Sequence, residues 1–176
     1  MTLNSLNGTG SFFKPLFFEF PDDHNAYYNI IYNVMVGQAL KVSFNSDTLG
    51  KNTTEFYFPQ GTWCEINKPD LYPCISSTDG VSMVLPSKAY DSYLHIREGW
   101  IVPLHDLADL KDVNFQTSID LQKRPLSLYV LGSVSQDDPT SWQASGNLYN
   151  DDGKVLDLVN NYNLYQFSAR FSKGKL

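Results

Sequence analysis

The chain has 176 residues, which is enough for one domain or two small ones. Its hydrophobic content of 42% and aromatic content of 14% are typical of a folded core and exclude a disordered tail. Thirteen basic and nineteen acidic residues give a net charge of -6 without a run of like charges, so nucleic acid is not an expected partner. A membrane span is not expected either, because no apolar run is long enough to cross a bilayer.

Three features bear on the compartment in which the protein folds. Residues Met1 to Asn7 lack a basic stretch followed by an apolar stretch, so we do not expect them to act as a signal peptide. Cys64 and Cys74 can form a small-loop disulfide in an oxidising compartment, or they can remain two free thiols. Asn7-Gly8-Thr9 and Asn52-Thr53-Thr54 are N-glycosylation sequons, a triplet that also arises by chance in an Asn-rich chain. These residues alone leave the compartment open.

The first predicted elements are a strand and a short helix. Lys14 to Pro21 has apolar residues on both faces, which is typical of a strand covered on both sides inside a parallel sheet. Tyr27 to Leu40 follows the turn Pro21-Asp22-Asp23 and spaces its apolar residues as a helix does. The segment Phe12 to Phe20 is so rich in apolar side chains that, left in water, it would form a large exposed patch. We therefore expect a protein partner to cover it.

The remainder of the chain has the rhythm of short antiparallel strands separated by turn residues, mostly glycine. One strand should place Tyr93, His95 and Arg97 on one face and the intervening residues on the other. Asp151-Asp152-Gly153 predicts a turn, and the alternating segment Tyr162 to Phe171 predicts the return strand of that hairpin. The segment Leu107 to Gln122 should link two β units. The side chains expected to point inward are those of Leu94, Ile96, Leu126, Leu128 and Val130.

Five segments in a consistent order resemble α-glucosidases of glycoside hydrolase family 31, and together they extend over most of the chain. They are Pro15 to Asp23, Gly37 to Val42, Tyr57 to Trp63, Tyr93 to Pro103 and Gly146 to Gly153. Several positions depart from the usual family pattern, and these are Lys14, Ile31, Asn33, Ser43, Phe44, Asn150 and Lys154.

The resemblance implies a mainly β fold made of two small antiparallel β-sandwich units, preceded by a barrel-derived strand and a short helix. In this division, residues 1–44 end a (β/α)8 barrel-like region, residues 45–106 form a proximal sandwich and residues 107–176 form a distal unit. Membership of this family would also imply a secretory, lysosomal or vacuolar location.

The same resemblance implies that this chain has no catalytic residues of its own. Retaining glycosidases use two carboxylates about 5 Å apart, and in family 31 both lie on barrel strands upstream of Lys14. We therefore assign no catalytic residue, metal or cofactor, and the substrate-binding residues stay unknown. The isolated chain should not hydrolyse α-glucosides.

Other residues that could form a site have a structural and a functional interpretation. Asp151 and Asp152 fit a turn better than a calcium site. The acidic group Glu19, Asp22 and Asp23 could border a substrate cleft or cap a helix. His95 is expected in a core or interface, whereas His24 and His105 lack a second ligand at metal spacing.

The three tryptophans are candidates for carbohydrate binding. Trp63, Trp100 and Trp142 could stack on sugar rings, although large rings more often anchor a core.

Three functions remain open on the sequence. The chain could complete an α-glucosidase whose catalytic barrel lies upstream. It could instead be a non-catalytic structural subunit of a larger assembly derived from this family. A free-standing carbohydrate-binding β module is the third alternative, and the apolar segment Phe12 to Phe20 favours the first two.

Overall fold

The computed structural model describes residues 10–28, 30–45, 52–88, 91–105, 117–154 and 161–172, with the backbone alone for residues 118–119. The chain forms two compact units, Met1–Glu98 and Gly99–Leu176. Both consist mainly of antiparallel strands, which confirms the predicted mainly β class. The expected division at residues 44 and 106 stays a prediction.

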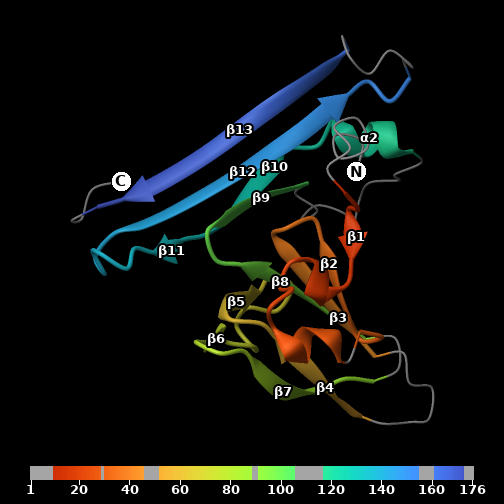
Figure 1. Ribbon diagram of the computed structural model, residues 1–176. Coiled ribbons are helices and arrows are strands. Elements are labelled where there is room, and N and C mark those ends of the chain that lie inside the picture. The colour runs from red at the N-terminus through yellow and green to blue at the C-terminus, as the bar shows by residue number, and fades with distance from the viewer. Residues whose placement is uncertain are drawn as a thin grey trace. The chain divides into compact units, whose positions relative to one another are not determined.

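The first unit contains a six-stranded sheet in the order β1-β2-β3-β8-β5-β6 and a two-stranded sheet of β4 and β7 (Figure 1). Two short 3-10 helices, η1 and η2, lie between β1 and β2. The bounds are β1 Phe13–Lys14, η1 Leu16–Phe18, η2 His24–Tyr27, β2 Asn33–Val36, β3 Leu40–Phe44, β4 Thr53–Phe58, β5 Gly61–Glu65, β6 Ile75–Ser77, β7 Val81–Pro86 and β8 Ser92–Arg97.

The core of the first unit includes large aromatic side chains from both sheets, together with aliphatic residues such as Leu16 and Met35. Phe56 and Phe58 of β4 and Trp63 of β5 are fully buried. The Phe56 ring meets the Tyr93 ring edge-on, with 5.8 Å between centroids, and the Phe58 ring meets His95 at 4.8 Å. The face of β8 that carries Tyr93 and His95 therefore packs against the β4–β7 sheet, in a sandwich arrangement. On the other face of β8, Ile96 is also buried, whereas Leu94 is only half-buried.

Two predicted elements near the N-terminus are wrong. The strand expected over Lys14 to Pro21 is confined to Phe13–Lys14, and the chain then turns into η1 because Phe18 and Glu19 donate backbone hydrogen bonds to Pro15 and Leu16. The helix expected over Tyr27 to Leu40 is instead the hairpin of β2 and β3. Its turn contains Gly37 with a φ of 63°, a left-handed conformation that glycine adopts readily.

The second unit has one five-stranded sheet among the described residues, in the order β10-β9-β12-β11, with β13 paired to β12. A helix, α2, precedes β10 and begins after the N-cap Thr117, whose hydroxyl accepts from the Asp120 amide. The bounds are β9 Trp100–His105, α2 Ser118–Gln122, β10 Leu126–Leu131, β11 Ser133–Val134, β12 Trp142–Asp151 and β13 Tyr162–Phe171.

The predicted C-terminal hairpin is confirmed. β12 and β13 pair along ten residues each, from Trp142 opposite Phe171 to Asp151 opposite Tyr162, and form a long ribbon (Figure 1). Of the segment expected to link two β units, residues 107–116 lie outside the described part, and residues 118–122 form α2.

The inward orientation predicted for Leu126, Leu128 and Val130 is wrong. These side chains share one face of β10, as the alternation requires, but they are between 42 and 47% exposed. Alternation identifies residues that lie on a common face, whereas burial also requires a second layer to cover that face.

We expect Gly146→Ala to destabilise the second unit, because a Cβ at this position would overlap the backbone carbonyl oxygen of Ile101. Ile101 belongs to β9, which β12 joins through the pair Ser145–Trp100, so the two strands would have to separate. The cost should be about 1–3 kcal/mol, as for other overpacked sites. Chemical denaturation monitored by tryptophan fluorescence would measure it. The neighbouring exposed Ser145→Ala should change stability little, and equal effects of the two substitutions would contradict the prediction.

Candidate functional site: a charged cluster beside an exposed apolar surface

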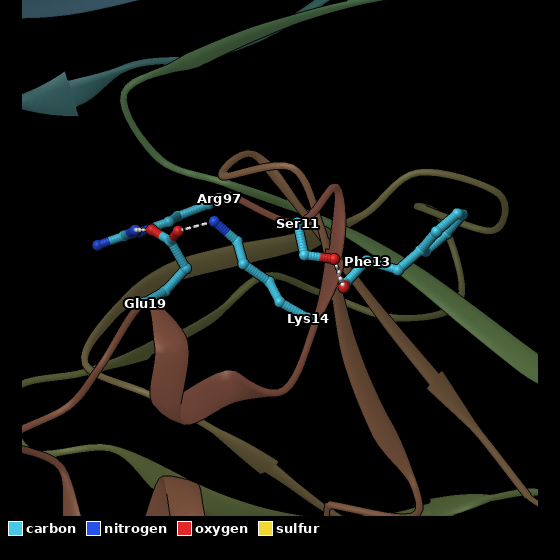
Figure 2. A network of polar contacts seen from close by, with 5 residues as sticks. All are labelled: Ser11, Phe13, Lys14, Glu19 and Arg97. Carbon is cyan, nitrogen blue, oxygen red and sulfur yellow. Dashed lines mark hydrogen bonds and ion pairs between the residues drawn. The ribbon is translucent and has the colours of Figure 1, made fainter. Parts of the chain in front are cut away.

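A cluster of three charged side chains, which we call the Arg97 cluster, joins the N-terminal segment to the six-stranded sheet (Figure 2). Lys14 ends β1, Glu19 follows η1, and Arg97 ends β8. The Glu19 carboxylate forms an ion pair with the Lys14 amine through Oε1, and its Oε2 lies 4.0 Å from Nη1 of Arg97. All three side chains are partly buried, so these contacts are screened less by solvent than surface ion pairs are.

Aromatic rings hold the Arg97 guanidinium in place. Its Cζ lies 4.6 Å from the centroid of the Phe20 ring and 5.9 Å from that of Trp63. Trp63 is opposite Arg97 in the β5–β8 register, and its indole nitrogen donates to the Pro59 carbonyl at 2.8 Å. Burial lowers the pKa of Arg97 from its ordinary value, and the carboxylates of Glu19 and Glu98 oppose that shift. The guanidinium is therefore a fixed charge in a position set by two rings and a carboxylate.

The N-terminal segment that carries Lys14 and Glu19 also carries a set of large apolar side chains that are exposed to water. We call this set the apolar N-terminal surface. They come from β1, η1, η2 and the turn before β2, and each is between 47 and 68% exposed. They are Phe13, Phe18, Tyr27, Tyr28, Ile30 and Ile31. The partly buried Phe17 ring contacts two of these side chains: it stacks on Tyr27 with 4.8 Å between centroids and meets Phe18 edge-on at 5.1 Å.

Two of the three acidic residues considered for a substrate cleft, Glu19 and Asp23, have structural partners. Asp23 is the N-cap of η2, and its carboxylate accepts from the Asn25 amide at 2.9 Å and from the Tyr57 hydroxyl at 2.7 Å. Burial, followed by the hydrogen bond to Asp23, raises the pKa of Tyr57 to about 12. The capping interpretation is therefore correct for Asp23, while Glu19 belongs to the Arg97 cluster and Asp22 is exposed.

Asp151 and Asp152 form the turn that the sequence predicts. The Gly153 amide donates to Asp151 Oδ1 at 2.9 Å, and the Lys154 amide donates to Asp152 Oδ1 at 3.0 Å. Gly153 has a φ of 64°, which explains the glycine at this position.

The histidines and tryptophans considered as possible site residues range from fully buried to exposed. His95 is fully buried, as expected for a core residue, whereas His24 is exposed on η2 and His105 lies 3.4 Å from the Arg124 carbonyl. Trp63 is fully buried and so cannot stack on a sugar. Trp142 stacks on Phe171 with 6.0 Å between centroids, and Gly132 packs against its ring.

Several further features of the described residues bear on the sequence analysis. Cys64 and Cys74 form a disulfide, which settles the alternative left open by the sequence.

No group of three or more His, Cys, Asp or Glu side chains in the described ranges is placed to hold a metal ion. Within the same ranges, no helix has the length and apolar character of a membrane span.

A row of buried ionisable residues was missed by the sequence analysis. Lys41 of β3 and Glu65 of β5 both lie opposite His95 of β8 in the strand register, and all three are buried. Lys41 Nζ donates to Asn33 Oδ1 at 2.7 Å and to the Ser43 hydroxyl, and it lies 3.9 Å from the Phe58 ring centroid. Burial lowers the pKa of Lys41 well below its ordinary value. Strand alternation alone could not have revealed that the polar residues of β3 face the core.

The model of the glycosyl hydrolase family 31 C-terminal domain matches residues 10–102, which is more than half of the chain. The chain belongs to this family. The residues of the Arg97 cluster and of the apolar N-terminal surface all lie within the matched range.

Two relatives agree with this assignment. The lysosomal α-glucosidases of Mus musculus and Rattus norvegicus are 28% and 27% identical to 89% of the chain. The chain spans 17% of the length of each.

Solved structures show the same fold at lower identity. A family 31 dextranase of Flavobacterium johnsoniae complexed with glucose matches 89% of the chain with a TM-score of 0.67 and 17% identity, over 17% of its own length. The glucosidase II α subunit matches 89% of the chain with a TM-score of 0.69 and 19% identity, over 15% of its own length.

We expect the first unit to lose stability in acid because of His95. Burial, aided by the nearby charge of Lys41, lowers the His95 pKa from 6.5 to about 3, so the folded chain holds the neutral ring. Below pH 6.5 the unfolded chain takes up a proton that the folded chain excludes, so stability should fall as the pH drops from 6.5 towards 3. The loss should reach a few kcal/mol, since each pKa unit corresponds to about 1.4 kcal/mol.

Urea denaturation at a series of pH values, with and without His95→Leu, would measure this effect. The variant should show a shallower decline in this pH range, because it has no imidazole to protonate. His24→Leu is the matched control, since His24 is exposed and its removal should leave the decline unchanged. Parallel pH profiles for the natural chain and His95→Leu would contradict the assignment.

Proposed function

We propose that this chain is the C-terminal β portion of an α-glucosidase-like hydrolase, and that its first unit docks onto the catalytic domain through the apolar N-terminal surface. The observation that carries the proposal is the exposure of Phe13, Phe18 and Tyr28 in a family 31 C-terminal domain. Fully burying each such side chain is worth about 1.5–3 kcal/mol. Soluble monomers rarely leave a set of this size in water.

The Arg97 cluster supports this proposal by fixing the segment that bears the surface. Two short 3-10 helices have few internal hydrogen bonds, so their positions depend on side-chain contacts. The pairing of Glu19 with Lys14 and Arg97 joins η1 to β1 and β8, and the Tyr57–Asp23 hydrogen bond joins η2 to β4. The surface is therefore presented on a prearranged framework, which lowers the entropic cost of docking.

In this proposal the chemistry belongs to the catalytic domain. Hydrolysis of an O-glycosyl bond by a retaining enzyme requires two carboxylates on opposite sides of the bond. The carboxylate of Glu19 instead forms an ion pair with Lys14, and those of Asp23 and Asp151 accept hydrogen bonds from backbone amides. The role of this chain is to stabilise the domain that bears the catalytic pair.

We expect the purified chain alone to hydrolyse a chromogenic α-glucoside no faster than the uncatalysed rate. Joined to a catalytic domain of its own polypeptide, it should support turnover. Asp151→Asn serves as a control, because a turn residue should not affect the rate in the joined protein. Turnover by the isolated chain that disappears in Asp151→Asn would contradict the proposal.

The isolated chain should also associate through the apolar N-terminal surface. Replacing Phe18 and Tyr28 together with Ser should shift the chain towards a monomer in sizing experiments with light scattering. Both side chains are exposed, so the substitutions should have little effect on the fold. In the joined protein, the same pair should weaken docking and expose residues 11–21 to protease.

Val84→Ser is the matched control for that experiment. Val84 is an equally exposed apolar residue, but it belongs to β7 and not to the proposed surface. Its replacement should leave association and protease protection unchanged. A monomeric natural chain whose residues 11–21 resist protease would show that the surface needs no partner.

A further inference from the structure

We propose that Asn52 carries an N-linked glycan, added as the chain passes through an oxidising secretory compartment. The proposal concerns a modification site in the first unit and does not depend on the proposed docking.

The position of Asn52 suits a glycan because its backbone is fixed while its side chain faces water. Asn52 is exposed and comes directly before β4, and its carbonyl accepts from the Ser87 amide at 2.8 Å. Thr54, which supplies the hydroxyl two residues later, pairs with Leu85 inside the two-stranded sheet. The sequon is acted on before the strand forms, and the finished fold then leaves room for the sugar.

Asn45 shows the opposite arrangement a short distance away. It contacts the same residue as Asn52, but its side-chain amide donates to the Ser87 carbonyl at 2.8 Å and is buried. Asp47 stands two residues after it, where a sequon requires Ser or Thr. Of these two asparagines bonded to Ser87, only the exposed one has the acceptor triplet.

The Cys64–Cys74 disulfide is an independent indication of the compartment. Structural disulfides form and persist in the secretory route and are rare where glutathione keeps thiols reduced. A disulfide that joins β5 to the segment before β6 and a usable sequon before β4 have no structural reason to occur together. Exposure to the compartment that oxidises thiols and glycosylates asparagine accounts for both.

A pocket beside Asn52 provides polar groups for the first sugar. It has a volume of about 290 Å³, and its lining includes Asn52, Lys68, Tyr72, Lys88 and Asp91. Ammonium, carboxylate and hydroxyl groups around an aromatic ring can hydrogen-bond an N-acetylhexosamine and pack against it. The pocket would thus hold the base of the glycan against the start of β4.

The covalent step transfers an oligosaccharide from a polyprenyl pyrophosphate donor. The Asn52 side-chain nitrogen forms a bond to C1 of the first sugar, and the bond from C1 to the pyrophosphate oxygen breaks. The polyprenyl pyrophosphate leaves with the electron pair, and the amide gives up one proton. No oxidation or reduction takes place.

The test uses the natural polypeptide isolated from its source cells. Mass spectrometry of the peptide that contains residue 52 should show added hexose and N-acetylhexosamine. Treatment with peptide-N-glycosidase should remove this mass and leave Asp at position 52, while Cys64 and Cys74 should resist alkylation until they are reduced. An unmodified Asn52, or freely alkylated cysteines, would overturn the proposal.

Variants expressed in the same cells separate Asn52 from the other sequon, at Asn7. In an Asn7→Gln background, Thr54→Ser keeps the required hydroxyl and should keep the glycan. Thr54→Ala removes the hydroxyl and should increase gel mobility to that of the enzymatically deglycosylated chain. Equal mobility of Thr54→Ser and Thr54→Ala would show that position 52 carries no sugar.

Discussion

The strand register and the stability of the first unit depend on how its core accommodates the buried amine of Lys41. A buried charge without partners costs several kcal/mol, so such an amine must be hydrogen-bonded or neutral. Lys41 meets the requirement with Asn33 of β2 and Ser43 of its own strand, and the Phe58 ring of β4 covers it. These contacts join the two sheets at one point. A slip of one residue in the β2–β3 register would turn Lys41 to the opposite face and leave its partners unpaired.

The same register connects the core with the proposed docking surface. β8 carries His95 opposite Lys41 and, two residues later on the same face, Arg97 opposite Trp63. Because side chains alternate along a strand, the pairing that buries His95 also directs Arg97 towards Phe20 and Glu19. The position of η1, and with it the exposure of Phe18, therefore follows from packing deep in the sheet.

How much could be predicted from the sequence differed with the range of the interactions involved. The turn at Asp151, Asp152 and Gly153 and its hairpin were predicted correctly, because short-range hydrogen bonds and one left-handed glycine decide them. The segment Tyr27 to Leu40 was misinterpreted because apolar residues at helical spacing also fit a hairpin that turns at Gly37. The Arg97 cluster could not be predicted, since it brings Arg97 of β8 to Lys14 and Glu19, which lie far from it in the chain.

Strand alternation specifies which residues share a face, and a second constraint decides which face is covered. In β3 the inward face carries Lys41 and Ser43. These side chains hydrogen-bond to each other there, and the Phe58 ring packs against the Lys41 amine. In β10 the alternation gives Leu126, Leu128 and Val130 a common face, yet they stay exposed, because the described second unit has a single sheet. A polar face can thus be buried and an apolar one exposed, and the neighbouring layer determines the outcome. A layer that covered the apolar face of β10 would add about 25 cal/mol of stabilising free energy for each Å² of apolar surface that it buried.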